Sequence, residues 1–458
     1  MKKEKIILSL IILLSLFLSL LCIHNGHEWG DDFALYIEQA KAINTHSLHT
    51  LYLHNKFLLD NSDTVISPYL YPNGFPLLLS FIYRVAGMNF IVMKCFCAIF
   101  FIASLPLLYI LFKNKFTNSF YPLLIVSAIA LQGVFISFSD NITSDLPFFF
   151  FCILSLVLIE NSKTLSMRIL LGFIILFTYT IRDTGLFLLL ALIVFDIQYS
   201  YKSNLFKKQP LSLLIPYIIF VIFYFVNRTL FFHDSSNLYA LFKPISFSVL
   251  MNGLDYYINL ISVYFFFPAI ASFLKIPLLI MLITGIIITL KKESYLVVFS
   301  LLSFSVYLIW PTSQGIRYIF PILPLCTYYI AQFFVWLSGY IKKQYVQILF
   351  AILVFTMAVR GIKYSIQFAK TNTNEAYTGE MVNMYYFITD NVPANKIICF
   401  AKPRALRLFT GVNGIVINDT ALLHSKADYT LKLQKDSSDI HLQPVFNTEH
   451  CYLYKIQR

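Results

Sequence analysis

The amino-acid sequence predicts an α-helical, polytopic membrane protein that carries a small α/β domain at its C-terminal end. Of its 458 residues, 58% are hydrophobic and only 13% are charged, and the mean hydropathy is +0.71. Soluble domains carry about 25% charged residues. Apolar runs of about 17–25 residues, each long enough to span a bilayer as a helix, recur through residues 1–361. Residues 362–458 are more polar and form the predicted second domain.

The distribution of basic residues indicates a membrane topology rather than nucleic-acid binding. The net charge is +12, but Lys and Arg gather in short loops between the apolar runs. The positive-inside rule places such loops on the cytoplasmic side. Six basic groups are assigned to that side: Lys2, Lys3 and Lys5; Lys113 and Lys115; Lys163 and Arg168; Lys202, Lys207 and Lys208; Lys291 and Lys292; Lys342 and Lys343.

These groups predict about eleven transmembrane helices. The first apolar run follows basic residues, as in a secretory signal, but no small-residue cleavage site follows it. The bulky Leu before Cys22 also argues against a lipoprotein site, so we expect an uncleaved first span. The predicted spans are residues 6–23, 91–112, 119–138, 146–160, 169–181, 184–199, 211–230, 276–290, 295–310, 319–338 and 346–360.

Three longer segments are predicted to lie outside the membrane: residues 24–90, 231–274 and the tail, 362–458. Within the first of these, apolar residues recur at helical spacing over residues 32–45, which predicts a helix in the membrane interface. Residues 71–84 begin with turn residues and continue as an apolar run that is too short to span comfortably.

The tail has the pattern of a small α/β domain. Its two cysteines, Cys399 and Cys451, could form a disulfide if the tail is exported, or could be two buried thiols. The predicted order is a helix at 380–390, a strand at 396–400, a helix beginning at 405–409, and strands at 414–418 and 451–455.

Two adjacent acids, Asp31 and Asp32, stand where the chain first leaves the membrane. Ionised groups there are costly unless solvated or paired, so they are candidates for function. A partly desolvated carboxylate can accept a proton from a hydroxyl as a general base, whereas Asp is also a preferred helix N-cap. Asp145, with Pro147 in the following turn, either caps the fourth span or serves as a further acid. Which of the first two acids is the base stays open.

Two arginines stand on the predicted outer side, against the positive-inside trend. Arg182 follows the fifth span, and Arg317 precedes Tyr318 at the start of the tenth. Arg forms bidentate contacts with phosphate, so the phosphate of a lipid is a natural partner. The alternatives are an ion pair between Arg182 and Asp183, a headgroup contact, and interfacial anchoring by Arg317 and Tyr318.

No metal-ligand pattern stands out. Histidines crowd the first external segment, but no two lie at i,i+4 on a clear helix, and the cysteines lack ligand spacing. We expect that no cofactor is required, with a divalent metal as the less favoured alternative. The histidines concerned are His24, His27, His46, His49 and His54.

The predicted topology brings the candidate residues to one face, from separate loops. A transporter more often holds its charges mid-span and shows repeated halves, and the sequence shows neither. Five motifs follow one another in order: Gly30-Asp31-Asp32-Phe33-Ala34-Leu35-Tyr36, Tyr-Pro-x-Gly-x-Pro-Leu from Tyr71, Ser144-Asp145-Leu-Pro147, Arg-x-x-Gly from Arg182, and Arg-Tyr-x-x-Pro from Arg317.

Together these motifs resemble the GT-C membrane glycosyltransferases, in the bacterial branch related to protein O-mannosyltransferases and to the aminoarabinose transferase of lipid A. The resemblance implies the GT-C fold and a polyprenyl-phosphate-linked sugar donor. It also implies a hydroxyl acceptor on a glycolipid, polysaccharide or protein, and a site on the outer face of the cytoplasmic membrane. Transfer would invert the anomeric carbon. Asp31 or Asp32 would be the base and Asp145 would orient the acceptor, while Arg182 and Arg317 would stabilise the departing phosphate.

Three other functions remain open on the sequence. An O-antigen ligase or polymerase shares many spans and external arginines, although not an acidic helix after the first span. A flippase or transporter of lipid-linked sugars would move its substrate without forming a glycosidic bond. A sensor or scaffold would act through its exported tail.

Overall fold

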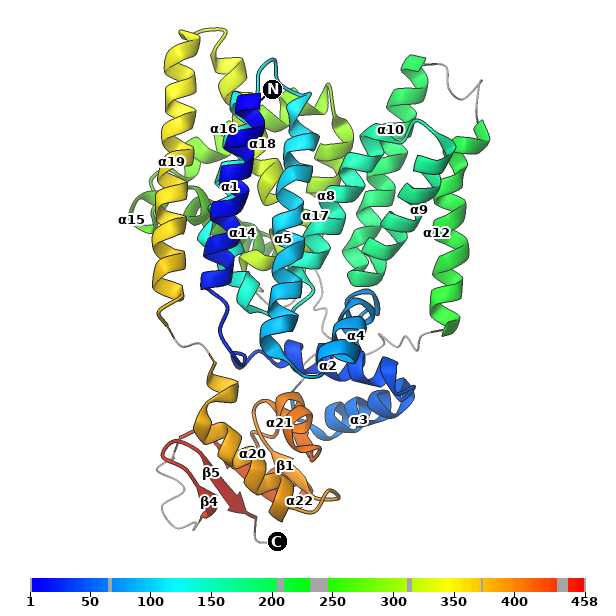
Figure 1. Ribbon diagram of the computed structural model, residues 1–458, viewed down its shortest axis with the longest axis vertical. Helices are drawn as coiled ribbons and strands as arrows, with labels where there is room; N and C mark the ends of the chain where they lie inside the picture. Colours follow the sequence, from blue (N-terminus) through cyan, green and yellow to red (C-terminus); the bar gives the residue numbers. More distant parts are fainter. Residues whose placement is uncertain are drawn as a thin grey trace.

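The computed structural model describes residues 2–64, 68–203, 210–230, 246–310, 315–371, 374–434 and 444–456. A helical bundle fills most of this part of the chain, and a small α/β unit stands at one end of it (Figure 1). The N-terminal helix runs through the bundle toward the α/β unit, and the C-terminus lies at the tip of that unit. We call the end of the bundle that faces residues 374–456 the tail-side end, and the opposite end the far end.

Four described helices are long and apolar enough to cross a membrane: α1 (Lys2–Leu21), α5 (Phe90–Lys113), α12 (Pro210–Leu230) and α19 (Lys343–Phe368). A bent pair, α6 (Phe120–Ala130) and α7 (Gly133–Ser137) with the turn η1 (Phe138–Asp140), makes a fifth if counted as one span, with a bend of 47°. At the bend, α19 comes so close that a Cβ on Gly361 would lie 1.9 Å from the Leu131 carbonyl oxygen.

The other predicted spans coincide with shorter helices. These are α8 (Asp145–Asn161), α9 (Leu165–Ile181), α10 (Leu186–Ser203), α16 (Lys275–Leu290), α17 (Ser294–Leu308) and α18 (Leu323–Leu337). The mainly helical membrane fold is therefore as predicted. The count of eleven transmembrane helices stays a prediction, because only four or five helices of the described residues meet the test of length and composition.

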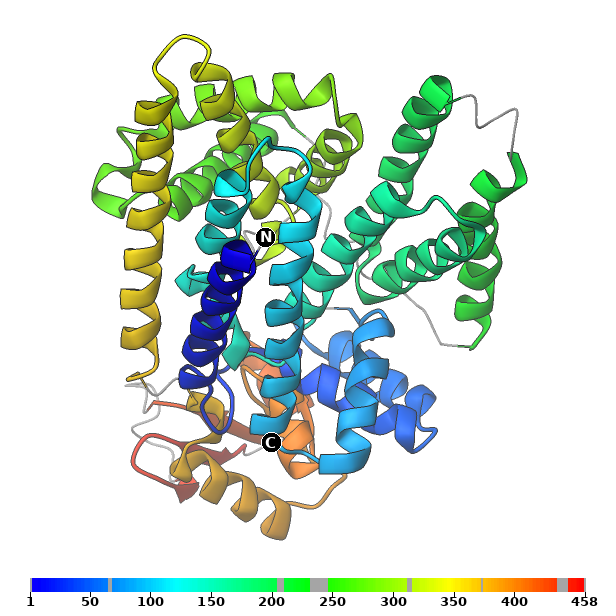
Figure 2. The same cartoon turned by 45° about the horizontal axis from the view of Figure 1, so that its top comes forward.

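Three helices of the first external segment lie across the tail-side end, between the bundle and the α/β unit (Figures 1 and 2). They are α2 (Asp31–Asn44), α3 (Leu48–Asn61) and α4 (Gly74–Ala86). Of these, α2 packs on α4 and on a helix of the α/β unit, so it is enclosed by protein. The start of α4 lies against the end of α9, where a Cβ on Gly74 would come within 2.7 Å of the Ile181 nitrogen. Only glycine allows this approach.

Helix α3 was not predicted from the sequence, nor were α14 (Phe247–Phe265) and the short α15 (Pro268–Ala271) in the second external segment. Polar residues interrupt the apolar pattern of α14, among them Asn252 and Asp255. Its structure therefore depends on packing against α17 and α19 more than on a visible period.

The tail forms a five-stranded sheet in the order β2-β1-β3-β5-β4. Strand β1 is parallel to β2 and β3, whereas β5 is antiparallel to β3 and β4. The strands are β1 (Ile397–Cys399), β2 (Asn413–Ile415), β3 (Tyr429–Lys432), β4 (Pro444–Asn447) and β5 (Tyr452–Lys455). The helices are α20 (Gly379–Asn391), α21 (Pro403–Thr410) and α22 (Thr420–Lys426).

This unit has a hydrophobic core of its own, in which α20 packs against the sheet through residues such as Met384, Ile388 and Leu453. Cys399 and Cys451 are two buried, free thiols: Cys399 ends β1, and Cys451 directly precedes β5, which is not a neighbour of β1 in the sheet. The boundary between residues 361 and 362 stays a prediction.

Candidate functional site

The predicted site residues come together at the tail-side end, from four separate elements. Asp32 lies in the first turn of α2, and Asp145 is the first residue of α8. Arg182 ends α9, while Arg317 and Tyr318 belong to the short helix η3 (Ile316–Ile319). These elements are far apart in the chain, and the bundle brings their ends to the same place.

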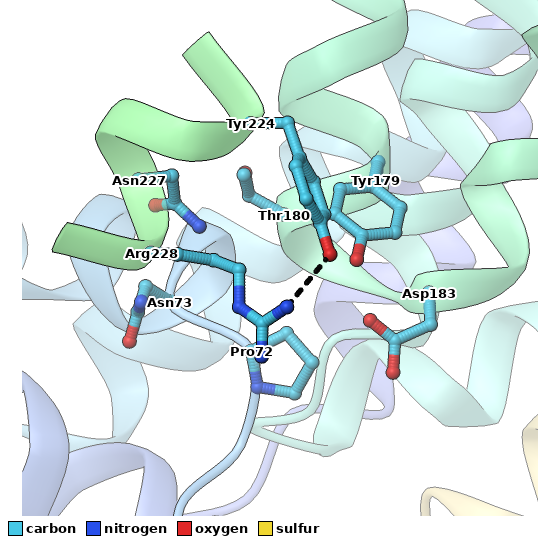
Figure 3. Close-up of a pocket in the computed structure, with 8 residues that line it drawn as sticks. All are labelled: Pro72, Asn73, Tyr179, Thr180, Asp183, Tyr224, Asn227 and Arg228. Atoms are coloured by element: carbon cyan, nitrogen blue, oxygen red, sulfur yellow. Dashed lines mark hydrogen bonds between the residues drawn. The ribbon is translucent and has the colours of Figure 1, made fainter. Parts of the chain in front are cut away.

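Two ion pairs organise these residues. Arg317 Nη2 lies 3.2 Å from Asp32 Oδ2, and Arg182 Nη2 lies 2.8 Å from Asp145 Oδ1. The carboxylate that meets Arg182 is therefore that of Asp145. Asp183, the alternative partner considered from the sequence, follows in the turn η2 (Asp183–Gly185) and lines the pocket drawn in Figure 3.

Tyr318 contacts both cations. Its ring centroid is 5.2 Å from the Arg182 guanidinium carbon and 5.3 Å from that of Arg317. Both distances are within the range of a cation–π contact, and the ring face offers negative potential to each cation. One aromatic ring thus helps to hold two like charges close together, which is the arrangement that an anion with several oxygens can bridge.

Three further polar side chains complete the network, and the sequence assigned none of them a role. Tyr71 donates a hydrogen bond of 2.6 Å to Asp32 Oδ1. Arg182 Nε donates to Ser144 Oγ at 2.9 Å, and the Tyr36 hydroxyl lies 2.9 Å from the same oxygen. The signal was present, because Tyr36, Tyr71 and Ser144 all lie within the five motifs.

The electrostatics keep both arginines of the site charged. Burial, the largest single influence, lowers the pKa of Arg182, but Asp145 together with three nearby tyrosines outweighs it, so the pKa is raised. The pKa of Arg317 is raised in the same way, because Asp145, Asp32 and Tyr318 together outweigh burial. The Asp145 side chain is fully buried, and neither of its oxygens accepts a well-formed hydrogen bond from the described residues. It therefore keeps capacity to accept a hydrogen bond from a substrate.

Asp31 points away from this network, into the α/β unit. Its Oδ1 accepts a hydrogen bond of 3.2 Å from the Ala405 backbone N–H in the first turn of α21. Burial raises the pKa of Asp31, although Arg404 acts in the opposite direction. The two adjacent acids are thus separated by direction: Asp32 faces the arginines, and Asp31 faces the tail.

The capping roles predicted for the acids are wrong in detail. Gly30 is the N-cap of α2 and Ser144 is the N-cap of α8, and neither helix has a side-chain capping hydrogen bond. Asp31 and Asp145 instead occupy the first helical position, where a negative charge still favours the helix dipole. Asp31 does satisfy a free N–H group at a helix start, but the helix is α21, which lies far along the chain.

The tail is fixed to the site by buried charges. Arg407 of α21 donates hydrogen bonds of 2.7 and 2.6 Å to the two carboxylate oxygens of Glu38 on α2, and a further one to Asn55 Oδ1 on α3. Arg404 is fully buried and donates to the Pro68 carbonyl oxygen at 2.7 Å. Since α2 carries Asp32, the tail helps to define the position of the site.

Two histidines of the first predicted external segment, His27 and His24, are held by contacts within the protein. His27 is buried, stacks on Phe33 at 4.0 Å and accepts a hydrogen bond from the Ile142 N–H; burial and the nearby Lys94 lower its pKa to about 3. His24 lies 3.1 Å from Asp140, which also pairs with Lys94.

Among the residues that the structure describes, the one group of three residues with metal-ligand geometry lies in the tail. It consists of Glu380, Glu449 and His450, at the surface of that unit and separate from the arginine pair.

A groove between α4, α9 and α12 opens beside the arginines. Its apolar part has a volume of about 420 Å³ and is lined by residues such as Leu77, Phe177 and Phe223. Asn73, Thr180 and Asn227 line both this part and a polar mouth.

Figure 3 shows that mouth, where Arg228 reaches from α12 over Pro72 and donates a hydrogen bond of 3.1 Å to the Tyr224 hydroxyl. Pro72 follows Tyr71 directly, and Thr180 lies two residues before Arg182. The mouth therefore adjoins the arginine site through both of these segments.

No protein-family profile matches the chain, and no curated protein sequence matches it. Solved structures do match its fold. ArnT from Cupriavidus metallidurans bound to undecaprenyl phosphate has a TM-score of 0.59 at 8% identity, over 99% of this chain and 98% of that one. The archaeal oligosaccharyltransferase AglB from Archaeoglobus fulgidus, in complex with an inhibitory peptide and a dolichol-phosphate, has a TM-score of 0.54 at 10% identity, over 95% of this chain and 70% of that one.

Both neighbours are GT-C glycosyltransferases, so the GT-C architecture expected from the motifs is confirmed. At these identities the likeness shows the fold alone. The substrates and the reaction of this chain follow from its site residues, as proposed below.

Proposed function

We propose that this protein is an inverting glycosyltransferase. It moves a sugar from a polyprenyl-phosphate-linked donor to a hydroxyl of a glycolipid, polysaccharide or protein, at the outer face of the cytoplasmic membrane. The observation that carries the proposal is the pair Arg182 and Arg317, both in contact with the Tyr318 ring, with the carboxylates of Asp32 and Asp145 beside them. The undecaprenyl phosphate and dolichol-phosphate bound by ArnT and AglB support a lipid-linked donor.

In this mechanism the acceptor oxygen attacks the anomeric carbon while the bond from that carbon to the phosphate oxygen breaks. The polyprenyl phosphate leaves with the electron pair of that bond. Arg182 and Arg317 stabilise the negative charge that grows on the phosphate, which is where positive groups lower the barrier most. The apolar groove beside Thr180 accommodates the first part of the lipid chain.

Asp32 is the general base. Its side chain is one-third exposed, so a substrate hydroxyl can reach it, whereas the inner oxygen of Asp31 is buried beside α21. Tyr71 and Arg317 orient the Asp32 carboxylate. Asp145 orients the acceptor by accepting a hydrogen bond from another of its hydroxyls; because the Asp145 side chain is fully buried beside Arg182, this contact requires the surrounding side chains to move when the acceptor binds. No required cofactor is part of the proposal.

Mass spectrometry of envelope lipids and glycans tests the proposal. Cells that lack the protein should lose one glycosylated species and accumulate its unmodified form. Complementation with the wild-type chain should restore the species, and complementation with Asp32→Asn should not, at equal protein levels. An unchanged glycan and lipid profile in the deletion strain contradicts the proposal.

A transport assay separates the competing membrane functions. Purified protein in vesicles should form a glycosidic bond between a polyprenyl-phosphate sugar and an acceptor extract. A flippase would move the labelled donor between leaflets and form no such bond. An O-antigen ligase or polymerase would use a long lipid-linked saccharide in place of a single sugar.

A further inference from the structure

A second cationic site lies at the tail-side end of the bundle, around Arg360 of α19. Arg360 is eight residues before the last residue of that helix, which at 1.5 Å per residue places it about 12 Å from the helix end. Its guanidinium donates hydrogen bonds to the Tyr264 and Phe266 carbonyl oxygens, where α14 ends and the chain turns into α15. It also lies 5.9 Å from the Phe267 ring.

Arg360 differs from other cations inside the bundle, which pair with carboxylates. Lys94 pairs with Asp140, Lys115 with Glu160, Arg168 with Asp196 and Arg182 with Asp145. Among the residues that the structure describes, no carboxylate oxygen lies within ion-pair distance of Arg360. Two carbonyls at a helix end supply about half a negative charge. The positive charge of the Arg360 guanidinium is therefore only partly balanced in these apolar surroundings. Intramembrane cations of this kind mark ligand sites.

Arg360 also lines a cavity. The cavity has a volume of about 340 Å³ and lies between α7, α14 and α19. Its walls are mainly apolar, with Val134, Leu260, Val263 and Pro268 among them, and Gln132 is the other amide or charged residue of the lining. Val263 and the nearby Phe267 and Ile270 are more than 40% exposed, so the apolar wall continues to the outside of the bundle.

We infer that this cavity binds an anionic membrane lipid, with the lipid phosphate on Arg360 and an acyl chain along the apolar wall. The missing negative charge selects an anionic headgroup, and the wall selects a hydrocarbon chain over a soluble anion. The level of the site fits a headgroup, because α15 ends at Ala271, shortly before Lys275, which opens the apolar helix α16. Ile316 lines the same cavity and precedes Arg317, so a bound lipid would also support η3.

This inference is independent of the proposed transfer reaction. Its test is the thermal unfolding of the full-length protein in neutral detergent, with added dioleoyl phosphatidylglycerol or dioleoyl phosphatidylcholine. Phosphatidylglycerol should raise the midpoint of the wild type, and phosphatidylcholine should not, because a ligand that binds only the folded state stabilises it. Inorganic phosphate at the same concentration should have no effect, since it makes no contact with the apolar wall.

Three variants locate the effect. Arg360→Gln should weaken phosphatidylglycerol binding at least about tenfold, because a charge-assisted hydrogen bond is lost. Lys363→Gln removes an exposed positive charge from the next turn of the same helix and should leave the lipid effect unchanged. Leu260→Trp should fill the cavity and remove the effect while the bonds from Arg360 to the carbonyls remain.

The alternative role of Arg360 is to cap the end of α14. In that case Arg360→Gln lowers the midpoint equally in both lipids, and Leu260→Trp keeps the shift produced by phosphatidylglycerol. That pair of results would overturn the lipid site, as would native mass spectrometry showing equal amounts of retained phosphatidylglycerol in wild type and Arg360→Gln.

Discussion

Charged side chains are enclosed at both ends of the helical bundle, but the two ends treat them differently. At the far end, Arg168 donates hydrogen bonds of 2.9 and 2.7 Å to the two oxygens of Asp196, and Tyr217 donates to the same carboxylate at 2.8 Å. Lys115 meets Glu160, to which Tyr295 also donates. Each of these enclosed charges has a partner of opposite sign, and each carboxylate has a further hydrogen-bond donor.

At the candidate site, on the tail-side end, the charges are paired but not saturated. The oxygens of Asp145 accept no well-formed hydrogen bond from the described residues, and Arg317 and Asp32 are 25% and 33% exposed. A network in which every charge and hydrogen-bonding group has a partner rigidifies the fold and offers no free group to a substrate. A network with unused hydrogen-bonding capacity can still accept hydrogen bonds from a substrate. The difference assigns stability to the saturated pairs, which include Arg407 with Glu38 at the tail-side end, and chemistry to the candidate site.

The largest effect is expected from Asp32→Asn. Removing the general base should lower the transfer rate by about 100- to 10,000-fold, whereas Asp31→Asn, one residue away, should lower it by less than about tenfold, because Asp31 contacts the tail. Initial rates with a lipid-linked donor, compared at equal amounts of folded protein, provide the measurement. Equal losses in the two variants would mean that the direction of the side chains does not decide their roles.

The next effect concerns the far end. Asp196→Ala leaves Arg168 buried without its carboxylate, which should cost about 3–5 kcal/mol of stability. The rate per folded molecule should stay at the wild-type value, since Asp196 lies on α10 and away from the site. Chemical unfolding in detergent measures the stability, and Asp255→Ala, which removes an exposed partner of Lys275, is the control with little expected change. A variant that folds normally but transfers slowly would contradict the division of roles.

The candidate site shows which features of the structure can be predicted from the sequence. The order of the motifs along the chain predicts that Asp32, Asp145, Arg182 and Arg317 share one face, because alternating spans send their loops to the same side. The pairing itself is not visible in the sequence. Asp183 is the neighbour of Arg182 along the chain, but Arg182 meets Asp145 on another helix.

Contacts between residues far apart in the sequence account for most features of the site that the sequence does not predict. Asp31 meets Ala405, and Glu38 meets Arg407, at separations of 374 and 369 residues. No local pattern encodes such partners. The groove needs the close approach of α4 to α9, which Gly74 permits but does not by itself predict. The arrangement of the site thus depends on tertiary packing that periodicity and motifs do not specify.

A smaller effect is expected from Arg317→Lys, which keeps the positive charge at the candidate site but removes the planar guanidinium group. Lysine cannot bind a phosphate in bidentate fashion. Loss of one charge-assisted hydrogen bond to the departing phosphate should lower kcat/KM for the lipid-linked donor by about 10- to 100-fold, mainly through kcat, because the charge grows in the transition state. Arg84→Lys, an exposed arginine of α4, is the matched control. If kcat is unchanged and KM alone rises, Arg317 binds the donor without stabilising the departing phosphate.

The smallest effect is a change in the pH dependence of stability at Asp31, where the tail-side end meets the tail. Burial raises the pKa of this carboxyl in the folded protein above its ordinary value of 3.8. Between the ordinary and the raised pKa the folded state holds the proton more tightly than the unfolded state, so the contribution of Asp31 to stability falls as the pH rises through the raised pKa. Asp31→Asn keeps an acceptor for the Ala405 N–H and carries no charge. The variant should therefore gain stability relative to the wild type as the pH rises above 3.8 toward the raised pKa, as followed by thermal unfolding at a series of pH values. The opposite trend would show that attraction to Arg404 outweighs burial, and would make Asp31 a member of the saturated class of charges found at the far end.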